Sequence, residues 1–198
     1  MYPDRETAMD ELSLSGQLNP GRWTAHCYYA ALAAEVIAMH CGMDAEKAFV
    51  CGLLHDIGRR KGISRMRHVI DGYEYAAGEG WDEAARICMT HSFPVRDIEA
   101  DILGADVSEE QYEFIADYLQ SIEYDDYDKL IILCDALAEA DGFCILEKRF
   151  VDSTRRYGMY PCTLDRWNKT FEYKAYFEER IGQGIYALLP GIEQCIYR

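Results

Sequence analysis

Apolar residues follow helical rather than alternating patterns along most of the chain, and Gly, Pro and Asp separate the apolar stretches. There is no convincing strand pattern and no Asn-Gly hairpin. The pattern predicts helices over about residues 4–14, 19–40, 44–57, 66–78, 81–91, 108–119, 127–150 and 163–189, the last as one helix or a pair. We therefore expect an all-α fold, a compact multi-helix bundle.

Helix boundaries carry recognisable end signals. Pro20 suits the first turn of its helix, and Gly42 is expected to end it. Asp44 is the expected cap of the next helix, which should end near Gly58. Ser108, three residues before Gln111, begins a capping box.

One stretch allows two interpretations. Residues 130–133, Leu-Ile-Ile-Leu, are compatible with a strand, but the Ala-Leu-Ala-Glu-Ala that follows favours a helix. We predict one long helix from Tyr127 to about Phe150.

Length and charge narrow the classes of function. The chain has 198 residues and 49% hydrophobic residues, which predicts a single domain over 1–198 with its own core. The formal charge of -15 disfavours binding to nucleic-acid backbones and to anionic membranes. The first residues do not resemble a signal peptide, and no apolar run reaches the roughly 18 residues of a membrane span, so we expect a cytoplasmic protein.

The eight cysteines include no Cys-x-x-Cys pair, which disfavours a zinc ribbon or a thioredoxin-like site. Most lie within apolar helical patterns and are expected to be free thiols in the core.

Histidines and aspartates form the most informative set. His26, His55, His68 and His91 lie on four different predicted helices or helix ends, and each has small or apolar neighbours. Asp135 interrupts an apolar run, where a lone buried carboxylate is costly unless it is paired or binds a cation. Imidazole and carboxylate ligands together suit Zn, Mn, Fe, Co or Ni, and a helical bundle can supply one ligand per helix.

The remaining histidine is a useful contrast. His40 follows His26 by 14 residues on the same predicted helix, about 21 Å away at 1.5 Å per residue. The two side chains cannot share one ion, so His40 is expected at the surface or at the helix end.

The segment GLLHDIGR, residues 52–59, resembles the signature of the HD superfamily of metal-dependent phosphohydrolases. His26 on its Ala-rich helix and Asp135 in the segment LCDAL match the rest of that pattern, and the resemblance covers roughly residues 20–140. It implies an all-helical HD-domain bundle in which a first metal binds the following residues: His26, His55, Asp56 and Asp135. The residues after about 140 form a C-terminal helical extension that matches no family pattern.

His68 and His91 resemble the two additional histidines of the two-metal branches of this superfamily, which include bacterial symmetrical diadenosine-tetraphosphate hydrolases. By that likeness Asp56 bridges two ions, and His68 and His91 hold the second. The resemblance thus implies one or two divalent transition metal ions, and hydrolysis of a phosphate ester or anhydride that depends on His55 and Asp56.

Cations follow the His-Asp pair directly. Five of the 20 Lys and Arg residues lie within nine positions from Arg59 to Arg67. We expect Arg59 and Arg60 to contact the phosphate of a small substrate such as a nucleotide. The alternative is a solvated loop that balances the acidic surface.

Aromatic residues gather in the C-terminal part, between Tyr157 and Phe177. We expect them to pack against the bundle or to form a homodimer surface, rather than to cover the pocket or stack on a base.

Four interpretations of function remain at this point. The leading one is a metal-dependent phosphohydrolase. The others are a catalytically silent, metal-bound domain that senses a nucleotide, a di-iron oxygenase on the same ligands, and a purely structural helical domain.

Overall fold

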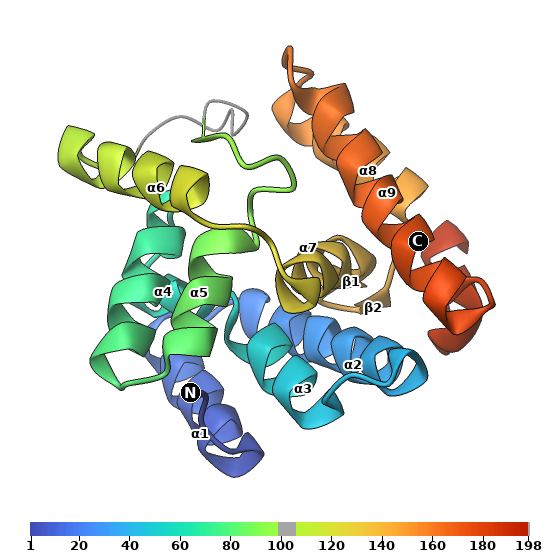
Figure 1. The fold of residues 1–198 in the computed structure, drawn as a ribbon, viewed down its shortest axis with the longest axis horizontal. Coiled ribbons are helices and arrows are strands. Elements are labelled where there is room, and N and C mark those ends of the chain that lie inside the picture. Colours follow the sequence, from blue (N-terminus) through green and yellow to red (C-terminus); the bar gives the residue numbers. More distant parts are fainter. Residues whose placement is uncertain (99–105, 198) are drawn as a thin grey trace.

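The fold is all-α, as the sequence predicts (Figure 1). A computed structural model describes residues 1–98 and 106–197. The α-helices span Arg5–Leu18 (α1), Trp23–Cys41 (α2), Ala45–Leu54 (α3), Arg67–Gly78 (α4), Asp82–Thr90 (α5), Glu109–Ser121 (α6), Asp126–Leu137 (α7), Leu146–Tyr157 (α8) and Thr163–Ile181 (α9). Short 3-10 helices span Ile57–Lys61 (η1), Ile185–Leu188 (η3) and Ile192–Tyr197 (η4), and two strands, Ala138–Glu139 (β1) and Gly142–Phe143 (β2), pair antiparallel.

Three of the predicted end signals are found where they were expected, whereas α2 begins at Trp23 rather than at Pro20. Gly42 ends α2 in the left-handed conformation, and the side chain of Asp44 accepts a hydrogen bond from the backbone of Lys47 to cap α3. Ser108 and Gln111 form the predicted capping box of α6.

The long helix predicted over 127–150 is wrong. Helix α7 ends at Leu137, strands β1 and β2 form a small hairpin, and α8 begins at Leu146. Gly142 has φ +137°, which an α-helix does not allow and glycine adopts readily. The hairpin turns at Ala140 and Asp141, and the conformation of Gly142 directly after them outweighs the helix propensity of the surrounding alanines.

The helix predicted to run to Ile57 ends three residues earlier, at Leu54. His55 is its C-cap, and the chain tightens into η1 directly after Asp56. Likewise, α9 ends at Ile181 and is followed by η3 rather than by a second α-helix.

Buried apolar side chains form three clusters that the central helices connect. The first joins α2, α3 and α7 to the C-terminal elements, the second joins α1 to α2–α5, and the third lies between α4, α5 and α6. Helices α2 and α3 contribute side chains to both the first and the second cluster, so these two helices connect the two clusters (Figure 1). None of the helices in the described part of the chain combines the length and apolar character needed to cross a bilayer.

Candidate metal centre

Close helix packing brings the first part of the centre together. Gly52 on α3 faces Ala31 on α2 so closely that a Cβ at position 52 would lie 2.7 Å from the Ala31 Cα. No larger residue fits there without moving α3 away from α2. The C-terminal end of α3, which carries His55, is therefore held beside His26 on α2, and the two imidazole rings lie 5.2 Å apart.

A second close approach positions α4. A Cβ on Gly58 would lie 2.0 Å from the backbone oxygen of His68 and 2.5 Å from the backbone nitrogen of Gly72. Glycine is therefore required where η1 touches α4. This contact brings His68 across from Asp56, the residue before η1.

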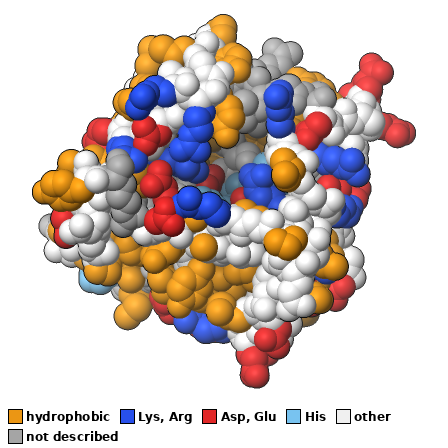
Figure 2. All heavy atoms as spheres, turned by 180° about the vertical axis from the view of Figure 1, so that it is seen from behind, with side chains coloured by type: hydrophobic (Ala, Val, Ile, Leu, Met, Phe, Trp, Pro, Cys, Tyr) orange, Lys and Arg blue, Asp and Glu red, His pale blue; other side chains and the backbone are white. Residues whose placement is uncertain are grey.

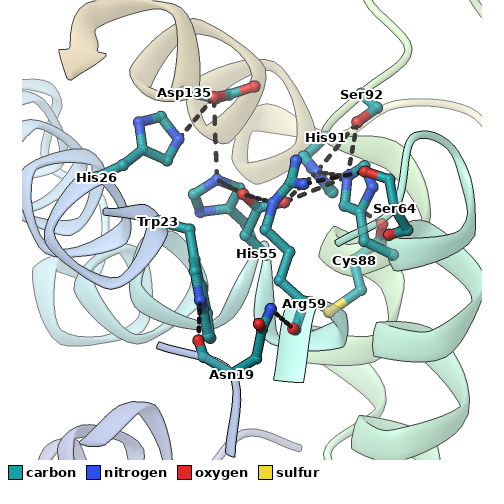
Figure 3. Close-up of polar contacts among 12 residues, drawn as sticks. Asn19, Trp23, His26, His55, Arg59, Ser64, Cys88, His91, Ser92 and Asp135 are labelled. Carbon is teal, nitrogen blue, oxygen red and sulfur yellow. Dashed lines mark hydrogen bonds and ion pairs between the residues drawn. The ribbon is translucent and has the colours of Figure 1, made fainter. Parts of the chain in front are cut away.

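Three residues from three elements converge on the first half of the centre (Figure 3). The Nε2 of His26 lies 2.9 Å from Oδ1 of Asp135, and the Nε2 of His55 lies 3.9 Å from the same oxygen. The Nε2 of His55 is also 3.9 Å from Oδ2 of Asp56. We call His26, His55 and Asp135 the first trio.

A second trio lies on the other side of the Asp56 carboxylate. It comprises Asp56, His68 and His91, all buried. The Nε2 atoms of His68 and His91 lie 3.2 and 3.4 Å from Oδ1 of Asp56 and 3.3 Å from each other. Asp56 thus turns one oxygen toward the second trio and the other toward His55 of the first.

Backbone carbonyls fix the orientation of all four imidazoles. The Nδ1 atoms donate to the carbonyl oxygens of Ala138 (from His26), Gly52 (from His55), Arg65 (from His68) and both Ile87 and Cys88 (from His91). A carbonyl oxygen can only accept, so the proton of each neutral ring is on Nδ1. The Nε2 lone pair of every ring therefore points into the centre, the arrangement typical of metal-binding histidines.

The end of α7 has a direct part in this arrangement. The carbonyl of Ala138 is available to His26, at 3.1 Å, because the chain leaves the helix there. In the predicted long helix this oxygen would accept an intrahelical hydrogen bond instead.

The donor set fits a divalent cation. Lone pairs of imidazoles and carboxylates face one another, and the buried Nε2 of His55 and Oδ1 of Asp56 have no hydrogen-bond partner among the described residues. Such a concentration of buried acceptors is unfavourable unless a cation lies between them. The mixture of nitrogen and oxygen ligands suits divalent transition metals.

Electrostatics keeps His55, His68, Asp56 and Asp135 in the ligand form, whereas for His91 the effect of burial is outweighed by the neighbouring Asp56, which raises the pKa of that ring. Burial lowers the pKa of His55 to about 4 and that of His68 to about 3, so both rings are neutral near pH 7. Burial opposes ionisation of Asp56, but the charge of Arg59 and the neighbouring histidines outweigh it and lower its pKa. Burial also opposes ionisation of Asp135, but the adjacent His26 and His55 together with Arg149 outweigh it and lower its pKa.

One cysteine lies near the centre. Cys27 is close enough to His55 and Asp56 to form a third potential ligand group. Burial raises the pKa of its thiol well above the ordinary value, which keeps it protonated and a poor ligand. None of the eight cysteines forms a disulfide.

Only one of the two arginines predicted to contact phosphate lies at the centre. Arg59 donates to Asp56, and Asn19 anchors its backbone oxygen at 2.6 Å. The side chain of Arg60 pairs with Glu11 at 3.3 Å and stacks over Tyr75, with 3.9 Å between its Cζ and the ring centroid. Arg60 is not among the residues that line the cavity beside the centre.

His40 is at the end of α2, exposed, with its Nδ1 2.8 Å from the backbone oxygen of Val36. Its position away from the centre agrees with the spacing argument.

A cavity of about 670 Å³ opens above the centre. Lys and Arg side chains surround a hollow in which histidine is visible (Figure 2). Its wall includes Arg22 and Trp23 of the α2 region, Arg59, and several residues of α8. The α8 residues that line the cavity are Lys148, Arg149, Asp152 and Arg156. They were not predicted from the sequence, although the spacing of Arg149, Asp152 and Arg156 places these three on one helical face.

Comparison with known proteins gives one match. The family model described as HD domain matches residues 23–140, more than half of the chain, and this segment contains both trios. No curated protein and no solved structure matches the chain.

Proposed function

The chain belongs to the HD domain family, whose members are generally metal-dependent hydrolases, and from this premise we propose that it is a metal-dependent phosphohydrolase. Its substrate in this proposal is a small phosphorylated molecule such as a nucleotide, and the bond cleaved is a phosphate ester or anhydride.

One observation carries the proposal. Four imidazole Nε2 lone pairs and two carboxylates converge in one pocket, with every Nδ1 already engaged by a backbone carbonyl. A structural domain gains nothing from such a concentration of mutually repelling lone pairs. The arrangement is favourable when cations bind to it.

The two trios support a site for two ions. Asp56 has one oxygen near His68 and His91 and the other near His55, so a single carboxylate can serve both halves. Divalent ions bound here would lower the pKa of a coordinated water and neutralise charge on phosphoryl oxygens.

The residues around the centre suit a phosphate group. Arg59 lies at the cavity wall with its guanidinium on the Asp56 carboxylate, where a phosphoryl oxygen next to the centre would meet it. A guanidinium can donate two parallel hydrogen bonds to phosphate. The backbone contact from Asn19 keeps Arg59 in this position.

The proposal is tested by assaying purified protein against a panel of phosphomonoesters, diesters and anhydrides with Mn, Fe, Co and Mg. We expect turnover with at least one metal and its loss in His55→Ala. His40→Ala is the matched control, because it removes an exposed histidine of the same fold without touching the centre. Protein that binds metal and nucleotide but turns over no phosphorylated compound would instead be a silent sensing domain.

A further inference from the structure

The cavity has a second lobe, which extends away from the metal centre between α7, α8 and α9. This lobe has a volume of about 250 Å³. It shares five lining residues with the larger cavity: His91, Ser92, Asp135, Arg149 and Arg156. Since His91 and Asp135 belong to the two trios, the lobes meet at the centre itself.

Two arginines stand at the junction. Arg149 and Arg156 are seven residues apart on α8, two helical turns, and therefore share one face. Among the described residues, the only carboxylate within 4 Å of Arg149 is Asp135, at 3.9 Å, and none lies that close to Arg156. Other cations of the wall are already paired, as Lys148 is with Asp152 at 2.6 Å.

The charges of Arg149 and Arg156 are available to bind a ligand. In a chain with a net charge of -15, two arginines without strong partners beside a centre of acidic and imidazole ligands are suited to an incoming anion. Both face the junction of the lobes, so the anion they hold would lie next to the centre. A phosphate group fits this description.

The second lobe differs from the first in its lining. Phe150 and Trp167 are stacked with 5.3 Å between ring centroids and 8° between planes, and both line the lobe together with Tyr157. Pro94 and Ile132 add further apolar surface. An aromatic wall of this kind favours a flat ring over a sugar or an inorganic ion.

We infer that the second lobe is a subsite for a planar aromatic ring of the substrate, whose phosphate is held by Arg149 and Arg156 at the metal centre. The ligand class is a phosphate compound of a heteroaromatic base, such as a nucleoside phosphate. This inference rests on the proposed function for the chemistry at the centre. Helices α8 and α9 lie beyond residue 140, where the family match ends, so this specificity belongs to the extension rather than to the shared domain.

Binding measurements test the ring subsite. Isothermal titration calorimetry on the metal-loaded protein would compare the phosphonate analogues of a nucleoside 5′-phosphate and of ribose 5-phosphate. The two ligands differ only in the base, and neither is hydrolysed. We expect the base to strengthen binding about tenfold, because a base that stacks on aromatic side chains gains a substantial favourable binding energy.

Substitutions assign this preference to residues. Trp167→Leu should reduce the preference to about twofold while the ribose analogue binds as before, and Trp167→Phe should restore most of it. Arg156→Ala should weaken both analogues about tenfold. Arg155→Ala is the matched control: it is the neighbouring residue on α8, its side chain is 80% exposed, and it lines neither lobe.

Equal affinity for the two analogues in the unmodified protein would overturn the inference, as would an equal loss for both in Trp167→Leu. If Trp167→Leu does not fold, unchanged affinities for both analogues in Arg156→Ala would equally overturn it. Absence of phosphate hydrolysis with every metal, with the base preference intact, would refute the proposed function and leave the subsite supported.

Discussion

The metal centre and the α8–α9 wall of the cavity are built in different ways. In the centre, His55, His68 and His91 are at most 4% exposed, and a backbone carbonyl fixes each ring. In the wall, Arg149 is half-buried and Arg156 is exposed, and among the described residues the one carboxylate within 4 Å of either is Asp135, 3.9 Å from Arg149. The chemistry thus depends on preorganised groups, whereas recognition depends on side chains that can adapt to a ligand.

The largest effect is expected at the residue that joins the two trios. Asp56→Ala removes an oxygen from both halves, so turnover should fall by at least about 10³-fold, the scale of the charge stabilisation that bound ions supply. His68→Ala affects only the second trio and should retain measurable activity. Steady-state assays at saturating metal would check this order, and equal activity of Asp56→Ala and the unmodified protein would contradict it.

The glycine at the close contact between η1 and α4 should also tolerate substitution poorly. Gly58→Ala places a Cβ 2.0 Å from the His68 oxygen and should lower the free energy of unfolding by about 3 kcal/mol. Gly78→Ala is the matched control, since a Cβ there meets nothing within 4 Å, and it should be neutral or stabilising by about 0.5 kcal/mol. Urea denaturation of both variants measures the difference. Equal stability would mean that η1 and α4 are not held together as described.

The smallest effects on kinetics are expected at the neighbouring residues Arg59 and Arg60, whose substitutions should change KM by different amounts. Arg59→Ala is expected to raise KM about tenfold with the metal content intact, because it removes a guanidinium from the cavity wall. Arg60→Ala should change KM by about twofold or less, since Glu11 and Tyr75 hold that side chain elsewhere. A larger effect for Arg60 than for Arg59 would reverse their roles.

The sequence predicts the centre better than the wall, for physical reasons. An aspartate that interrupts an apolar run, Asp135, and histidines on separate helices stand out because such residues are costly in a core without a partner. The arginines of α8 are ordinary surface residues in the sequence, and only tertiary packing brings them to the centre. Their face could not be assigned while residues 127–150 were expected to form one helix.

The hairpin turn at Ala140 and Asp141, just before Gly142, is a local feature that helix propensity masks in the sequence. Helix propensity of the alanines suggested continuity, whereas the turn both ends α7 and leaves the Ala138 carbonyl for His26. Hairpin formation in this case completes the metal centre as well as redirecting the chain. By contrast, caps such as Asp44 and Ser108 depend only on neighbouring backbone, and they were predicted correctly.

Elemental analysis of the purified protein tests the central claim most directly, because it counts the ions that the two trios bind. We predict about two divalent transition ions per chain in the unmodified protein, about one in His68→Ala, and close to none in Asp56→Ala. Two ions retained in Asp56→Ala, or none in the unmodified protein after incubation with Mn, Fe, Co, Ni or Zn, would contradict a centre in which one carboxylate joins two metal sites.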